Sequence, residues 1–223
     1  MEDEMIMCVQ AEDVEFDEGY TPLEFTNDTA SDYYLRLLDS ATFKPRSKVE
    51  SDETYKQIIV YCIITNGSGI YRYARVGGEG RLVGEYSIGI GGHVNISDSM
   101  LSDFSRVEAI DQAVRREVSE EVYSTDTDVY DYLLSIPVFN TVGVINDNSN
   151  PVGRVHLGVV VLLDIEDMTI INKDENIHQA GFASFEEISD SIEDYEKWSQ
   201  ILIEEYLRSS LWDSTMKTLS IPF

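Results

Sequence analysis

The stretch from Arg116 to Val122 restricts the possible folds of this chain more than any other. Its sequence is Arg-Glu-Val-Ser-Glu-Glu-Val. On a helix, Glu117, Glu120 and Glu121 occupy positions i, i+3 and i+4 and share one face. Valines at every fourth residue can bury the opposite face. Carboxylates crowded on one face repel each other, and a hard cation such as Mg²⁺ or Mn²⁺ would relieve that repulsion. A solvated acidic helix face explains the spacing equally well.

A glycine-spaced apolar run lies upstream of this block. The sequence from Ser87 to Val94 is Ser-Ile-Gly-Ile-Gly-Gly-His-Val, which is typical of a strand entering a tight loop. Gly91 and Gly92 permit backbone shapes and close approaches that a side chain would block. Glycine pairs alone are weak signals, since ordinary turns use them too. This pair gains significance from the acidic block downstream of it.

The glycine pair, Glu108 and the acidic block together resemble the Nudix box, the signature of the Nudix hydrolase superfamily. The box pattern is G-x5-E-x7-R-E-U-x-E-E-x-G-U, with U aliphatic. Six positions match it with the x7 spacing intact: Glu108, Arg116, Glu117, Val118, Glu120 and Glu121. There are two departures. Fifteen residues separate Gly92 from Glu108 where the pattern has five, and Tyr123 replaces the glycine that ends the box helix.

The segment from Arg81 to His93 is similar to a phosphoesterase-like branch of the superfamily, which tolerates such an insertion. The resemblance covers roughly residues 43–207. It implies a Nudix α/β/α sandwich with a mixed β-sheet between helices, and a hydrolase that uses Mg²⁺, with Mn²⁺ as the second candidate. A longer loop costs little closure entropy, so the insertion does not exclude this fold.

The resemblance also assigns roles to residues of the box. The implied metal ligands are the backbone carbonyl of Gly91 and the carboxylates of Glu117, Glu120 and Glu121. Glu120 is the central member of this set. Arg116 is expected to form an ion pair with a box glutamate instead of holding substrate. Glu108 is expected to be either the partner of Arg116 or an outer metal ligand.

Substrate contacts and the general base lie outside the box helix in this interpretation. Glu175 lies in the loop where many relatives carry the base, although a base from the box itself is an equal candidate. His93 can reach a phosphate or order the glycine loop through a hydrogen bond. His156 is either a core histidine or a residue lining the pocket. Arg46 precedes the first strand of the resembling region and is a candidate for contacting substrate phosphate.

The net charge of −26 limits the partners of this chain. Such a field repels polyanions, which disfavours sequence-independent binding to DNA or RNA. The acidic residues are dispersed, and this favours a surface adapted for solvation over a decoy that imitates nucleic acid. A small nucleotide-type substrate remains compatible, because a bound cation inverts the local field.

Other global features favour a cytoplasmic protein without a membrane partner. The sequence has no apolar run long enough to cross a bilayer and no basic, apolar leader of the secretory kind. Cys8 and Cys62 cannot build a disulfide framework, and Cys62 is expected to be a small core residue. The oligomeric state stays open, with a homodimer among the options.

The pattern of apolar residues predicts two regions. Residues 1–42 are expected to be an acidic extension, loosely docked at its start, with a short strand near residues 5–9 and a helix near residues 31–38. Residues 43–223 are expected to form the Nudix domain. Its strands are predicted at 57–65, 70–76, 82–90, 133–145 and 155–165, and its later helices at 185–192 and 195–210.

The chain is therefore expected to be a Mg²⁺-dependent hydrolase that cleaves a phosphoanhydride bond in a nucleoside diphosphate linked to another moiety. A non-catalytic Nudix nucleotide sensor is the first alternative, and the intact set of box glutamates argues against it. An acidic inhibitor or nucleic-acid mimic that binds a protein is the second. The inserted segment from Asn95 to Val107 is either a surface excursion or a flap that sets specificity.

Overall fold

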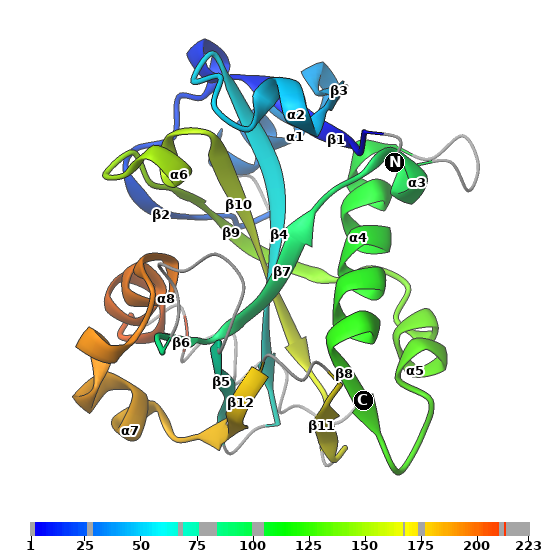
Figure 1. Ribbon diagram of the computed structural model, residues 1–223, viewed down its shortest axis with the longest axis vertical. Coiled ribbons are helices and arrows are strands. Elements are labelled where there is room, and N and C mark those ends of the chain that lie inside the picture. The colour runs from blue at the N-terminus through cyan, green and yellow to red at the C-terminus, as the bar shows by residue number, and fades with distance from the viewer. Residues whose placement is uncertain are drawn as a thin grey trace. The chain divides into compact units, whose positions relative to one another are not determined.

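The computed structural model describes residues 3–25, 29–66, 69–75, 84–99, 105–166, 168–173, 177–209 and 212. The chain forms two compact units. The first contains Met1–Tyr61, Gly91–Glu117 and Asn140–Val161, and the second contains Cys62–Ile90, Val118–Phe139 and Leu162–Phe223. Four elements continue from one unit into the other: strands β4 (Tyr55–Thr65), β7 (Gly89–His93) and β10 (His156–Asp164), and helix α4 (Arg106–Glu121), which is the long green helix in Figure 1.

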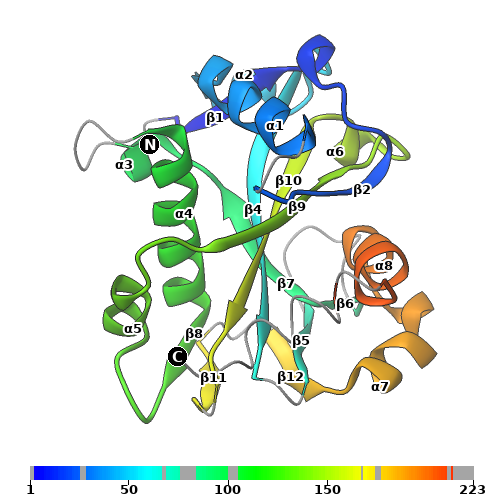
Figure 2. The same ribbon diagram turned by 180° about the vertical axis from the view of Figure 1, so that it is seen from behind.

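Strands β4 and β10 provide the core of the first unit. Both are nearly continuous apolar runs whose residues are buried along most of their length, as expected for strands covered on both faces. The neighbouring strands are β1 (Met5–Gln10), β2 (Gly19–Pro22), β3 (Thr42–Pro45) and β9 (Asn140–Asn146). Strand β1 pairs antiparallel with β3 and with the start of β4, and β2 pairs antiparallel with β9 (Figure 2).

The N-terminal strand is an integral part of the first unit. Ile6, Met7, Cys8 and Val9 are buried, and Cys8 lies opposite Gln57 of β4. The short strand expected near residues 5–9 is present as β1, and its apolar run pairs with a sheet that it helps to cover. A boundary between residues 42 and 43 would separate β1 from its partner β3.

The expected helix after this strand is present as α1 (Thr29–Ser40), which buries Tyr34, Leu37 and Leu38. The shorter helices of this unit are α2 (Arg46–Val49), α3 (Ile96–Ser99) and α6 (Pro151–Arg154), with a 3-10 turn η1 at Ala11–Asp13. Helix α3 begins the inserted segment, whose residues 100–104 lie outside the described residues.

The second unit contains a separate set of strands and helices. Its strands are β5 (Ile70–Arg75), β6 (Tyr86–Ser87), β8 (Val122–Ser124), β11 (Ile170–Asn172) and β12 (Ile177–Ala183). Strand β5 pairs with β12, β6 and the end of β4, and β8 pairs with β11. The helices are α5 (Val129–Ser135), α7 (Phe185–Asp190) and α8 (Lys197–Leu202) (Figure 2). The short 3-10 helix η2 spans Ile192–Asp194, and α8 continues into the π-helix η3 (Ile203–Leu207).

Two predicted strands differ from the structure. The run predicted at 133–145 begins with the end of helix α5, and strand β9 starts only at Asn140. Asp128 explains the helix, because its side chain accepts a hydrogen bond from the Asp131 amide (3.1 Å) and caps the first turn. The glycine pair lies inside strand β7 instead of in a loop after it.

The predicted fold class is confirmed, since the chain is an α/β protein with a mixed sheet and helices. Among the described residues, no helix is both long and apolar enough to cross a membrane. Both cysteines are buried, and burial raises the pKa of each thiol to about 12.

Candidate functional site

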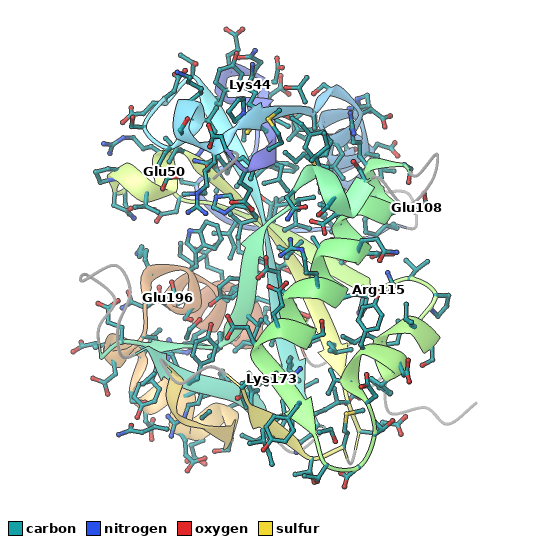
Figure 3. The ribbon with its side chains drawn as sticks, turned by 45° about the vertical axis from the view of Figure 1, so that its right-hand side comes forward. Lys44, Glu50, Glu108, Arg115, Lys173 and Glu196 are labelled. Atoms are coloured by element: carbon teal, nitrogen blue, oxygen red, sulfur yellow. The ribbon has the colours of Figure 1, made fainter. Side chains whose placement is uncertain are left out.

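The first turn of α4 is closed by a capping box that includes Glu108 (Figure 3). The amide of Ser105 donates to Glu108 Oε2 (2.7 Å), and the Glu108 amide donates to Ser105 Oγ (3.3 Å). These two bonds satisfy amides that a helix start leaves without internal partners. The structure thus gives Glu108 a role in starting the helix, while Arg116 pairs with other acids.

Arg116 joins three segments of the first unit. Its Nε and Nη2 atoms donate to the two carboxylate oxygens of Asp98, at 3.0 and 2.9 Å. Its Nη1 donates to Glu117 Oε1 at 2.5 Å, and Nη2 also donates to the carbonyl oxygen of His93 at 2.8 Å. The expected ion pair with a box glutamate is present, with Glu117 as the glutamate. These carboxylates raise the pKa of Arg116 against the opposing effect of burial, so the guanidinium stays charged.

Sequence reasoning missed Asp98 as a site residue. It lies on α3 in the inserted segment, and its side chain is only 4% exposed. Asp98 Oδ2 also accepts the Asn95 amide (2.9 Å), while the Asn95 side chain accepts the Ser97 amide (3.0 Å). The spacing Asn-x-x-Asp is the signal that could have revealed this short capped turn.

The glycine pair of β7 allows close contacts that side chains would prevent. A Cβ atom on Gly92 would overlap the carboxylate of Glu117, and one on Gly91 would overlap the carbonyl oxygen of Val60. The Glu117 carboxylate therefore lies directly over Gly92, with Arg116 bound to one of its oxygens. This arrangement places a box acid against the backbone that the sequence predicted to be a metal-binding loop.

Two histidines meet beside this backbone. The rings of His93 and His156 are 5.5 Å apart, and His93 Nε2 lies 2.9 Å from Gln57 Oε1. Burial, with Arg46, His156 and Arg116 nearby, lowers the pKa of His93 to about 3. Burial also lowers the pKa of His156, whose Nδ1 donates to the Val152 carbonyl oxygen at 2.8 Å. Both rings are neutral at pH 7.

Arg46 lies at the start of α2 and is 41% exposed. Its guanidinium pairs with Glu4 at 3.2 Å and with Glu50 at 3.0 Å. Exposed pairs of this kind contribute little to stability, on the order of 0 to 1 kcal/mol each.

Lys56 is a second residue that sequence reasoning missed. Its ammonium donates to Asn148 Oδ1 (2.9 Å), to the Gly153 carbonyl (3.0 Å) and to the His156 carbonyl (3.2 Å). Burial lowers its pKa to about 8. These bonds hold the turn before β10 and thereby the backbone of His156. A lysine directly before a predicted apolar strand is the signal that was present in the sequence.

The C-terminal end of α4 carries the other two box acids. Glu120 is exposed and Glu121 is half-buried. The Lys173 side chain donates to the Ser119 carbonyl (2.6 Å), and its amide donates to the Glu121 carbonyl (2.7 Å). Lys173, labelled in Figure 3, thus satisfies carbonyls that a helix end leaves open.

Tyr123 stands where the box pattern has glycine, and the structure accounts for it. The chain passes directly from α4 into β8, where Tyr123 lies opposite Ile171 of β11. A helix that continues into a strand does not need the left-handed residue that glycine provides at many helix ends.

The donor set at this site suits a hard cation, although it is not a preformed cage. Within the described residues, no three Asp, Glu, His or Cys side chains converge closely enough to hold a metal ion. Mg²⁺ commonly binds through one or two carboxylates together with waters and substrate phosphates, so the carboxylates of α4 and the backbone carbonyls of β7 are donors of the right chemistry. Glu175, the predicted loop base, lies outside the described residues.

Comparison with known proteins assigns the fold. No family model matches the chain. The crystal structure of Tm1382, a candidate Nudix hydrolase, matches 90% of this chain and 96% of its own, with a TM-score of 0.68 and 28% identity. A NUDIX hydrolase from Alicyclobacillus acidocaldarius matches 75% of this chain and 98% of its own, with a TM-score of 0.52 and 12% identity. The chain therefore has the fold of the Nudix hydrolase superfamily.

A further protein is similar along nearly its whole length. Protein YmaB of Bacillus subtilis (strain 168) is 28% identical over 211 residues, which cover 91% of this chain and 97% of that protein. The similarity thus extends well beyond the box.

Proposed function

We propose that this protein is a Mg²⁺-dependent Nudix hydrolase that cleaves a phosphoanhydride bond in a nucleoside diphosphate linked to another moiety. The observation that carries the proposal is the position of Glu117. Its carboxylate lies over Gly92 of β7 and is held there by Arg116, which also binds the His93 carbonyl. A solvated acidic helix face would not require a glycine beneath one of its acids.

The metal would be held by residues of α4 and β7. Glu117, Glu120 and Glu121 stand at i, i+3 and i+4 on one helix, and the Gly91 carbonyl supplies a further oxygen. A bound Mg²⁺ neutralises phosphate charge and lowers the pKa of a coordinated water. The role of Arg116 in this site is to fix the first acid and the strand backbone relative to each other.

The neutral histidines and Arg46 form the proposed phosphate-binding side of the site. His93 is ordered by Gln57, and His156 is ordered by the Val152 carbonyl. A neutral imidazole has one N–H, and each ring already donates it in these bonds, so the two histidines would line this side of the site without donating to the phosphate. Arg46 can add a charged donor after exchanging Glu4 or Glu50 for the substrate. A box carboxylate is the general base in this proposal, with Glu175 as the alternative.

The test is a substrate screen combined with a matched pair of variants. Purified protein is assayed with Mg²⁺ or Mn²⁺ against nucleoside triphosphates, ADP-ribose, dinucleoside polyphosphates and capped RNA. We expect hydrolysis to two phosphate-bearing products, such as a nucleoside monophosphate and the phosphorylated second moiety, that disappears with a chelator and rises toward alkaline pH. Glu120→Gln should lower turnover by at least about 100-fold, because metal-held charge contributes several kcal/mol to transition-state stabilisation.

Glu108→Gln is the control, because it removes the same charge from the same helix. It should keep the cap, because glutamine also serves at this position of a capping box, and it should leave turnover nearly unchanged. Equal turnover of folded Glu120→Gln and wild type would contradict the proposal. Nucleotide binding without any turnover would instead favour the sensor.

A further inference from the structure

The inserted segment reaches the site through Asp98. The segment lengthens the loop between the glycine pair and the box helix, and its first residues form the short helix α3. Two contacts with β1 hold the residues just before α3, and burial of Asp98 anchors α3 itself. The Met7 amide donates to the Val94 carbonyl (2.7 Å), Ile6 forms a β-bridge with Asn95, and Asp98 is nearly fully buried. The start of the insertion is thus packed in place.

The partners of Asp98 are groups that the proposed site depends on. Its two carboxylate oxygens accept hydrogen bonds from Nε and Nη2 of Arg116, which is the bidentate geometry that arginine forms with carboxylates. The same guanidinium also donates hydrogen bonds to Glu117 and to the His93 carbonyl. Asp98 therefore fixes the plane of the guanidinium, and that plane decides where the Glu117 carboxylate and the end of β7 lie.

We propose that Asp98 is a positioning residue for the metal-binding acid Glu117, supplied by the insertion. The inference rests on the proposed function. It differs from the flap hypothesis, because the described part of the insertion acts through its contact with the box arginine. It also explains how Glu108 can serve as a helix cap, since the partner of Arg116 comes from α3.

The experiment measures Mn²⁺ affinity together with backbone exchange. Wild type, Asp98→Asn and Asp98→Glu are titrated with Mn²⁺, and free ion is followed by electron paramagnetic resonance. Asparagine keeps the size of the side chain, but it offers one oxygen where Arg116 needs two. Removing a residue that orients a metal ligand typically weakens metal binding by about 10–100-fold, and we expect a loss of that order. Asp98→Glu should fall between the two.

Asp39→Asn is the matched control, because it removes one negative charge from an exposed position of α1 in the same unit. It should bind Mn²⁺ like wild type. Amide hydrogen exchange across residues 91–95 gives a second measurement that does not require metal. Asp98→Asn should exchange at least about 10-fold faster there, because the His93 carbonyl loses a fixed donor.

The outcomes separate this inference from the proposed function. Mn²⁺ affinity and exchange of Asp98→Asn within about twofold of wild type would overturn the positioning role, whatever happens to the melting temperature. If wild type itself binds no Mn²⁺, the proposed function fails, and the exchange rates alone decide whether Asp98 positions this backbone. If Asp98→Asn does not fold, Asp98→Glu provides the same two measurements.

Discussion

Lys56 and His156 are polar residues of the first unit whose side chains form hydrogen bonds with the segment around the start of β10. The Lys56 ammonium donates to Asn148 and Gly153 in the segment before β10 and to the carbonyl of His156, the first residue of β10. The His156 ring then donates to Val152 in the same segment. Each buried polar group is therefore paired within a short stretch of backbone, which is the condition for burying it without a large penalty.

A pH dependence of stability results from the lowered pKa of His156. Burial and the neighbouring Arg46 and Lys56 lower this pKa, although the bond to Val152 and the charge of Glu50 oppose the shift. The unfolded chain takes up a proton near the ordinary histidine pKa of about 6.5, before the folded chain does. The unfolded state therefore binds more protons below that pH, and folding stability should fall as the pH decreases through it.

The measurement compares wild type with His156→Asn in thermal melts from pH 8 to pH 5. Asparagine Nδ2 can replace the imidazole Nδ1 as the donor to Val152, but it does not titrate. We expect the variant to lose less stability on acidification than wild type, with similar stability of the two proteins above pH 7. Parallel curves for the two proteins would show that His156 is not protonated on unfolding.

At the scale of elements, strand β7 and helix α4 are fitted to each other through the glycine pair. The two glycines face different neighbours, since Gly91 faces the backbone of β4 and Gly92 faces the flexible end of the Glu117 side chain. Backbone cannot yield, while a carboxylate can rotate away. Gly91 therefore serves the packing of β7 against β4, while Gly92 leaves space for the Glu117 carboxylate.

Substituting alanine at each position tests this difference. Gly91→Ala should lower the free energy of unfolding by about 1–3 kcal/mol, because overpacking against fixed backbone forces strands apart. Gly92→Ala should cost less stability, yet it should displace the Glu117 carboxylate and lower turnover and Mn²⁺ affinity. Denaturant melts and metal titration measure the two effects.

Gly181→Ala is the control, because a Cβ atom there meets no other atom within 4 Å and its backbone is not in the left-handed region. It should leave stability and metal affinity unchanged. Equal losses of stability at Gly91 and Gly92, with full activity retained in Gly92→Ala, would show that Glu117 does not depend on the space above Gly92.

At the scale of the whole molecule, acidity is the dominant property. The chain has 42 Asp and Glu residues against 16 Lys and Arg, which gives a net charge of −26. Repulsion among so many like charges acts against the compact state. Ion pairs such as those of Arg46 and Arg116 offset this repulsion only locally.

Salt should therefore stabilise this protein. The screening length falls from about 30 Å at 0.01 M to about 3 Å at 1 M ionic strength, so distant acids stop repelling each other. We expect the melting temperature at pH 7.5 to rise between about 0.02 M and 0.5 M salt, to the same extent in sodium and potassium chloride. A melting temperature that is flat or falls over this range would show that the acids are already compensated in the folded state.

The sequence by itself determined the elements whose signals are local. The apolar runs of β4 and β10 and the four-residue valine repeat of α4 specify strands and a helix through backbone periodicity and burial alone. The spacing of Glu117, Glu120 and Glu121 likewise places them on one helix face before any packing is considered. The superfamily fold could be predicted for the same reason, because the box combines these local patterns.

Only the tertiary structure decided which groups meet across the chain. Asp98 is 18 residues from Arg116, and although its Asn-x-x-Asp spacing indicates a capped turn, no local rule pairs it with that arginine. For Glu108, the capping box with Ser105 is a local pattern, and the tertiary structure decided only that Arg116 pairs with Asp98 and Glu117 instead. The short strand near residues 5–9 was expected, but its pairing with β3 and β4 was not, because those strands lie far along the sequence. Such pairings depend on geometry that forms when distant segments pack, and the sequence of one segment does not contain it.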